Sequence, residues 1–348
     1  MKWIAATALL VATAGCASSG TASRPVGGLT QKQAVAGCAS GTPVTGRPLR
    51  LATTVAPITS IVASIVGDTG AVVTGVVPEG TNSHTFEPQP SAAKNLETAD
   101  IVFVNGLLLE DPTKELAVAN LTKGSEICEL GTATLPASQW IYDFSFPKSG
   151  GKPNPHLWTN PPMARQYGQV VTTALSHMDP ANAAAYQRNF DTFAAEVDQL
   201  DSAMATATAS LPAGQRVLLT YHDAYAYFAQ HFGWKVVGAI QPSNFEEPTT
   251  KEVANLINQV KAEGVKAIFG SEVFPSSVLE QIGNEAGVKY VDVLRDDDLP
   301  GAPGEPDHSW FGLMRFDFVT LIDALGGDSS SLTSLPKSTL PDHASYPQ

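Results

Sequence analysis

The sequence predicts an α/β protein with two parallel-sheet α/β lobes joined by one long rigid helix. The lobes are predicted by two observations: short apolar runs alternate with helical segments before residue 178, and the same alternation returns after residue 213. A third predicts the joining helix, since residues 181–211 contain neither Gly nor Pro. A chain of 348 residues is long enough to divide into two domains that each bury a core.

In the first half, apolar runs predict buried strands at residues 49–55, 71–77 and 100–105. The segment 57–66, between the first two runs, is expected to be a helix. Runs that are apolar throughout are typical of parallel strands covered on both faces.

The second half repeats this alternation. Strands are expected at residues 216–220, 236–240, 267–271 and 289–294, and helices at 224–231, 250–263 and 276–286. Strands that alternate with helices indicate βαβ units and therefore a second parallel sheet.

The linking helix is expected over residues 179–212, with Pro180 in its first turn and the Asp179 side chain as its cap. Five apolar residues recur at helical spacing and predict a buried stripe: Phe190, Phe193, Val197, Leu200 and Met204. A helix of about 30 residues is about 45 Å long, which is enough to cross both lobes. We therefore expect a strut rather than a flexible hinge.

The first residues have the layout of a bacterial secretory signal: Lys2, an apolar stretch, and then Ala14-Gly15-Cys16. The small residues before Cys16 resemble the lipobox of bacterial lipoproteins, although Thr13 departs from the usual Leu. We expect a signal peptide at residues 1–15 and a lipid on Cys16, which would anchor the protein on the extracytoplasmic face of the cell membrane. Secretion without a lipid is the alternative.

The remaining organisation follows from composition. We expect a tether rich in Gly, Ala, Ser and Thr at residues 16–48, an N-terminal lobe at 49–178, a C-terminal lobe at 213–327 and a flexible tail at 328–348. The two other cysteines, Cys38 and Cys128, favour a disulfide because the protein is exported, with two free thiols as the alternative. They lack CxxC spacing, which makes metal binding by this pair a poor interpretation.

Charge and absent motifs narrow the function. A formal net charge of −13 argues against nucleic acid as a partner and suits a protein that handles cations. The chain has no HExxH, GxSxG, GxxxxGK[ST] or GxGxxG motif, which favours binding over catalysis. What remains is three histidines at turns beside predicted strands: His84, His156 and His222. His84 and His222 lie beyond strand ends, where open parallel sheets bind ligands.

Three motifs around these histidines carry a resemblance. They are HTFEPxPS from His84, PHxWxxP from Pro155 and HDAxxYFA from His222. In this order they resemble the cluster A-I receptors of ABC importers, which bind zinc or manganese. The resemblance implies a fourth ligand, an Asp shortly before a Leu, which falls on Asp297, with Asp296 and Asp298 as near alternatives.

The resemblance implies a non-enzymatic receptor that passes its metal to a membrane permease with a cytoplasmic ATPase, and we expect a monomer. His84 and His156 would come from the first lobe, and His222 and Asp297 from the second. Three imidazoles and one carboxylate suit four-coordinate zinc. In the family a third-position His accompanies zinc and Glu accompanies manganese. Many zinc receptors also carry a His-rich loop, whereas residues 138–155 contain no histidine, so manganese is retained as the alternative.

Carboxylates near these motifs are candidates for orienting the histidine rings: Glu87, Asp223 and Glu272. Two other classes of protein compete with the receptor. A secreted zinc hydrolase would use three histidines and an open position for water. In an adhesin or structural lipoprotein, metal binding would be incidental.

Overall fold

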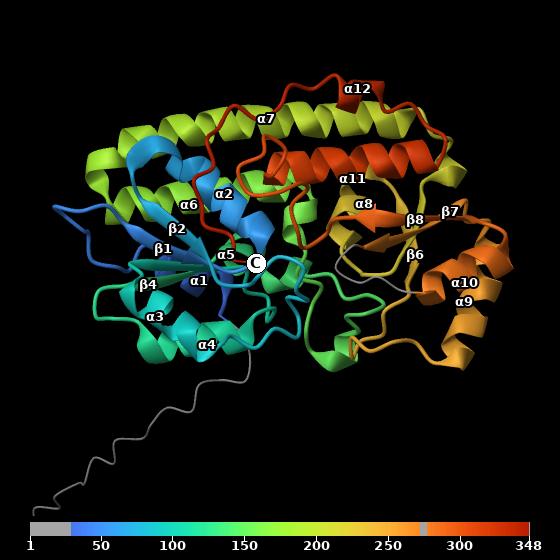
Figure 1. The fold of residues 1–348 in the computed structure, drawn as a ribbon, viewed down its shortest axis with the longest axis horizontal. Helices are drawn as coiled ribbons and strands as arrows, with labels where there is room; N and C mark the ends of the chain where they lie inside the picture. Colours follow the sequence, from blue (N-terminus) through green and yellow to red (C-terminus); the bar gives the residue numbers. More distant parts are fainter. Residues whose placement is uncertain (1–28, 272–276, 348) are drawn as a thin grey trace, which may run out of the picture.

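The computed structural model describes residues 29–271 and 277–347. The predicted signal peptide, Cys16 and Glu272 lie outside the described residues, as do the first residues of the predicted tether. Two lobes lie side by side, and one long helix, α7, runs along both of them (Figure 1). This is the predicted architecture.

The first lobe contains a four-stranded parallel sheet in the order β2-β1-β3-β4. Its strands are β1 (Arg50–Thr53), β2 (Val72–Gly75), β3 (Ile101–Val104) and β4 (Glu126–Glu129). The central strand β3 is buried at every residue, as its apolar sequence predicts. Helices cover both faces: α3 (Pro90–Thr98) and α4 (Asp111–Asn120) on one, α2 (Ala56–Val66) and α6 (Pro161–Met178) on the other.

The second lobe has the same strand order, β6-β5-β7-β8, and all its pairs are parallel. Its strands are β5 (Val217–Thr220), β6 (Lys235–Ala239), β7 (Ala267–Ser271) and β8 (Lys289–Leu294). Helices α9 (Thr250–Glu263) and α10 (Ser277–Ala286) cover one face, and α8 (Ala226–Phe232) and α11 (Trp310–Ala324) the other. Because all strands in each sheet are parallel, their carboxyl ends lie at one edge of the sheet, which is where open parallel sheets bind ligands.

Helix α7 covers Ala183–Ala209, 27 residues, after a single 3-10 turn at Pro180–Asn182. The five residues of the predicted apolar stripe are all buried. One continuous core joins α7 to residues of both lobes. The predicted cap differs, because the carboxylate of Asp179 accepts hydrogen bonds from the side chains of Asn182 and Tyr186 rather than from the backbone.

The N-terminal segment folds onto the first lobe from residue 29. Helix α1 (Gln31–Gly37) packs against α5 (Leu130–Thr134) and β4. Cys38 and Cys128 form a disulfide across a sequence separation of 90 residues, which confirms the predicted pairing. The predicted tether therefore includes a folded part.

The C-terminal segment, expected to be flexible, packs along the molecule instead. It forms α12 (Ser330–Thr333), in which Leu332 is fully buried, and Ser345 then pairs in parallel with Thr74 of β2. This pairing satisfies backbone groups at the edge of the first sheet. Among the helices of the described residues, none is both long and apolar enough to cross a membrane.

Candidate metal centre

His84 lies in the loop that follows β2. Asn82, two residues earlier, accepts a hydrogen bond of 2.9 Å from the His84 backbone N–H. A hydrogen bond from an Asn side chain to the backbone two residues later stabilises a turn, which here holds His84 in place. The imidazole of His84 stacks on Phe245 from the second lobe, with ring centroids 4.6 Å apart.

His156 is held by the same local device. Asn154 Oδ1 accepts hydrogen bonds from the His156 backbone N–H at 3.1 Å and from its Nδ1 at 2.8 Å. The second bond places the ring proton on Nδ1, so that Nε2 presents a lone pair. A 3-10 turn (Leu157–Thr159) follows, and Asn160 then caps α6. His156 itself is completely buried.

His222 comes two residues after the end of β5, at the carboxyl edge of the second sheet. Its Nδ1 lies 2.8 Å from Oε1 of Gln241, which follows the neighbouring strand β6. The amide oxygen again places the proton on Nδ1 and leaves Nε2 with its lone pair. Two amide side chains thus orient two of the three rings.

Asp297 follows β8 within a run of three aspartates that are all buried. Asp296 Oδ1 accepts from the Ser271 hydroxyl at 2.9 Å, and Asp298 Oδ2 accepts from the Gly80 backbone N–H at 2.7 Å. Asp297 Oδ2 accepts from the Ser83 hydroxyl at 2.6 Å, while its Oδ1 is buried without a hydrogen-bond partner. Asp298 Oδ1 is likewise buried without a hydrogen-bond partner, but among the three aspartates only Asp297 belongs to the group formed with His84, His156 and His222.

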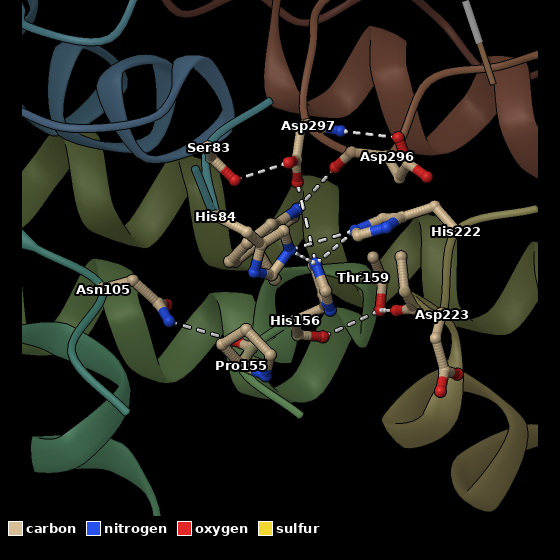
Figure 2. A network of polar contacts seen from close by, with 12 residues as sticks. Ser83, His84, Asn105, Pro155, His156, Thr159, His222, Asp223, Asp296 and Asp297 are labelled. Carbon is tan, nitrogen blue, oxygen red and sulfur yellow. Dashed lines mark hydrogen bonds and ion pairs between the residues drawn. The ribbon is translucent and has the colours of Figure 1, made fainter. Parts of the chain in front are cut away.

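The four side chains converge between the lobes (Figure 2). His84 Nε2 lies 3.1 Å from His156 Nε2 and 3.2 Å from His222 Nε2, and the latter two atoms are 2.9 Å apart. Asp297 Oδ1 lies 3.8 Å from His156 Nε2. The four ligand atoms are all within 4.8 Å of one another, and within the described ranges this is the one such group that could hold a metal ion.

Electrostatics favour a cation at this point. Burial, followed by the neighbouring His222, holds the pKa of His84 and of His156 well below the usual value, so both rings are neutral at neutral pH. Burial raises the pKa of Asp297 to about 6, which His222 opposes. Converging lone pairs and one buried carboxylate oxygen repel one another unless a positive charge lies between them.

Of the three predicted ring-orienting carboxylates, the structure describes Glu87 and Asp223, and it gives neither of them that role. Glu87 is exposed, and Glu272 lies outside the described residues. Asp223 is buried, but its carboxylate accepts from the Ser145 N–H, and its carbonyl accepts from the Asn154 amide. Neutral amides, Asn154 and Gln241, contact the rings instead. The sequence contained a signal for Asn154, because an Asn stands two residues before both His84 and His156.

The other four histidines contact partners away from the cluster. His177 lies 2.9 Å from the carbonyl of Gly41, and the remaining three contact carboxylates: His231 with Asp201, His308 with Glu79 and His343 with Asp68. The cluster therefore contains the three histidines that the motifs single out, together with the middle aspartate of its run.

Two α/β lobes on one long helix, with a group of metal-ligand side chains between them, define a bilobal protein that could hold a metal ion between its lobes. Residues 51–324 match the family described as ZnuA, zinc-uptake complex component A, periplasmic. The chain belongs to this family, the cluster A-I metal-binding receptors of ABC importers. The resemblance stated from the three motifs is thereby confirmed, and a hydrolase is excluded.

Similar proteins carry different metals in their names. The chain is 28% identical to the iron-binding protein YfeA of Yersinia pestis, over 81% of this chain and 88% of that protein. It is 26% identical to the manganese-binding lipoprotein MntA of Halalkalibacterium halodurans, over 83% and 94%.

Among solved structures, the periplasmic zinc-binding protein TroA of Treponema pallidum has the same fold. Its TM-score is 0.72 at 24% identity, and the match covers 80% of this chain and 99% of that one.

Proposed function

We propose that His84, His156, His222 and Asp297 bind one zinc ion, and that the protein delivers it to the permease of an ABC importer. The observation that carries this proposal is the buried Oδ1 of Asp297, which has no hydrogen-bond partner and faces the three Nε2 atoms. A buried carboxylate oxygen without a partner is costly, and a bound cation removes that cost.

The donor set favours zinc over manganese. Imidazole nitrogens are borderline ligands that suit zinc, whereas manganese prefers sites rich in oxygen, and this cluster offers three nitrogens and one oxygen. Manganese remains the second candidate, because a relative with 26% identity over most of the chain is a manganese-binding lipoprotein.

Metal content and thermal stability test the proposal together. Protein purified without added metal is analysed for its elements, stripped with a chelator, and melted with zinc or manganese at equal concentration. An ion at 100 times its Kd that binds only the folded state stabilises it by about 2.7 kcal/mol. Zinc should raise the melting temperature clearly and manganese much less, and His222→Ala should remove most of the zinc effect.

Two results would overturn the assignment. If manganese stabilises the parent as strongly as zinc, the preference for zinc is wrong while the site stands. If neither ion stabilises the parent and His222→Ala melts like the parent, the four residues are not ligands. Asp297→Asn should also remove most of the zinc effect, and Asp323→Asn, at an exposed position of α11, is its control.

We propose further that a lipid on Cys16 holds the protein as a monomer on the extracytoplasmic face of the membrane. Support comes from the Ala14-Gly15-Cys16 sequence and from relatives named as lipoproteins. A receptor anchored beside its permease meets it by diffusion in two dimensions.

A further inference from the structure

A cavity of about 270 Å³ lies beside the cluster, where the two lobes meet. His84 is the one member of the quartet that lines it, and His84 is also the member that is not fully buried. The first lobe contributes Leu107, Leu108 and Phe146 to its wall, and the second contributes Phe245. The cavity has room for several water molecules, so a partly hydrated ion fits beside His84.

The wall of this cavity contains unusual backbone. Within residues 29–271 and 277–347, the non-glycine residues with positive φ are Leu107 (51°), Leu108 (64°) and Phe245 (60°). All three line the cavity. Left-handed backbone in a residue with a bulky side chain costs about 1 kcal/mol or more, and such strain gathers where a structure must move or hold a ligand.

The wall of the first lobe is firmly anchored. Buried Glu110 accepts hydrogen bonds from the backbone N–H groups of Asn105 at 2.6 Å and Gly106 at 3.1 Å. The Asn105 amide donates in turn to the carbonyl of Pro155, the residue before His156, at 3.0 Å. This network ties Leu107 and Leu108 to the interior, as Figure 2 shows for Asn105 and Pro155.

The part of the cavity wall that comes from the second lobe is held only by contacts within a short turn. Phe245 sits in a short turn in which its backbone N–H donates to the carbonyl of Pro242 at 2.9 Å, and its neighbours Asn244 and Glu246 are exposed. Its ring covers one face of His84, with an angle of 13° between the ring planes. Moving Phe245 therefore disrupts few buried contacts, releases strained backbone and uncovers His84.

We propose that this cavity is the passage through which the metal ion enters and leaves the cluster, and that Phe245 is the gate. The inference rests on the proposed function, because it requires that the quartet bind a metal. A gate raises the barrier in both directions, so removing it accelerates association and dissociation equally and leaves Kd almost unchanged. A residue that only supports His84 would affect dissociation and therefore Kd.

The test uses Phe245→Gly and Phe245→Ala in the whole protein. Glycine accepts a positive φ without strain, so Phe245→Gly removes the ring and keeps the turn, whereas Phe245→Ala removes the ring and keeps the strain. Phe316→Ala is the matched control, since Phe316 is an exposed phenylalanine on α11 outside the cavity. Stopped-flow mixing measures zinc association, and dilution into excess chelator measures zinc release.

Both Phe245 variants should bind and release zinc about tenfold faster, which corresponds to a barrier lower by about 1.4 kcal/mol. Their Kd should stay within about threefold of the parent's, and Phe316→Ala should match the parent in all three quantities. Unchanged rates in both Phe245 variants would overturn the proposal. Faster release with unchanged association would also overturn it, because Phe245 would then only support His84. If the parent binds no metal, the proposed function itself fails, and the passage fails with it.

Discussion

Replacing buried Glu110 by Gln should change how the stability of the metal-free protein depends on pH. Its carboxylate accepts hydrogen bonds from the Thr54 hydroxyl and from the backbone of Asn105 and Gly106. Burial nevertheless dominates and raises the pKa of Glu110 to about 7, from an ordinary value of 4.5. This difference corresponds to about 3 kcal/mol.

The direction of the effect follows from proton binding. Between pH 4.5 and about 7 the folded state holds a proton on Glu110 that the unfolded chain has lost, so the free energy of unfolding falls as pH rises. The contribution of Glu110 to stability is complete below pH 4.5 and is lost by about pH 7. Glutamine does not titrate, so the free energy of unfolding of Glu110→Gln lacks this pH-dependent contribution.

Urea unfolding of parent and variant at several pH values measures the effect. The free energy of unfolding of Glu110→Gln minus that of the parent should increase by about 3 kcal/mol from pH 4.5 to pH 7.5, and then stay constant. Taking the difference cancels the other buried carboxylates. A difference that stays within about 0.5 kcal/mol over this range would refute the reasoning, and exposed Glu263→Gln is the control.

Three further predictions concern other parts of the chain. Cys16→Ser should move the protein from the membrane fraction to the soluble fraction, as fractionation and immunoblotting would show; an unchanged distribution contradicts lipidation. Replacing both Cys38 and Cys128 by Ser should lower the free energy of unfolding by about 4–5 kcal/mol, because the bond closes a long loop, and denaturant unfolding measures this loss. Asn154→Ala and Gln241→Ala should each weaken zinc binding by about 10–100-fold in competition titrations, because each amide orients one histidine; an unchanged Kd would contradict that role.

Local pattern was sufficient for most of the fold. Near-continuous apolar runs predicted both parallel sheets, and α9, β7 and β8 begin and end where the sequence predicted. Strand β4 was not foreseen, because its four residues, Glu126–Glu129, include two glutamates. Both are buried, one accepting from the Gly41 N–H and the other from the Thr132 hydroxyl. Gly41 is separated from Glu126 by 85 positions along the chain, so this partner cannot be read from local sequence.

The termini show the same limit. Segments rich in small and polar residues predicted a tether and a flexible tail, because composition measures only the average tendency to bury surface. Single side chains decide otherwise here, since buried Cys38 and Leu332 attach these segments to the folded lobes. Whether a terminal segment packs therefore depends on the surface of the folded lobes, which composition does not describe.

Sequence by itself indicated the class of protein and the three histidines of the candidate site, because the motifs around them are contiguous in the chain; for His84 and His156, an Asn two residues earlier also fixes the turn locally. Tertiary structure distinguished between the aspartates, since Asp297, in the segment after β8, contacts Ser83 of the first lobe and has its Oδ1 beside His156. It also decided that amides orient the rings and that Phe245 covers His84. The contacts of Asp297 and Phe245 join residues from different lobes, and Gln241 reaches His222 from a neighbouring strand end, so their geometry exists only once the chain has folded.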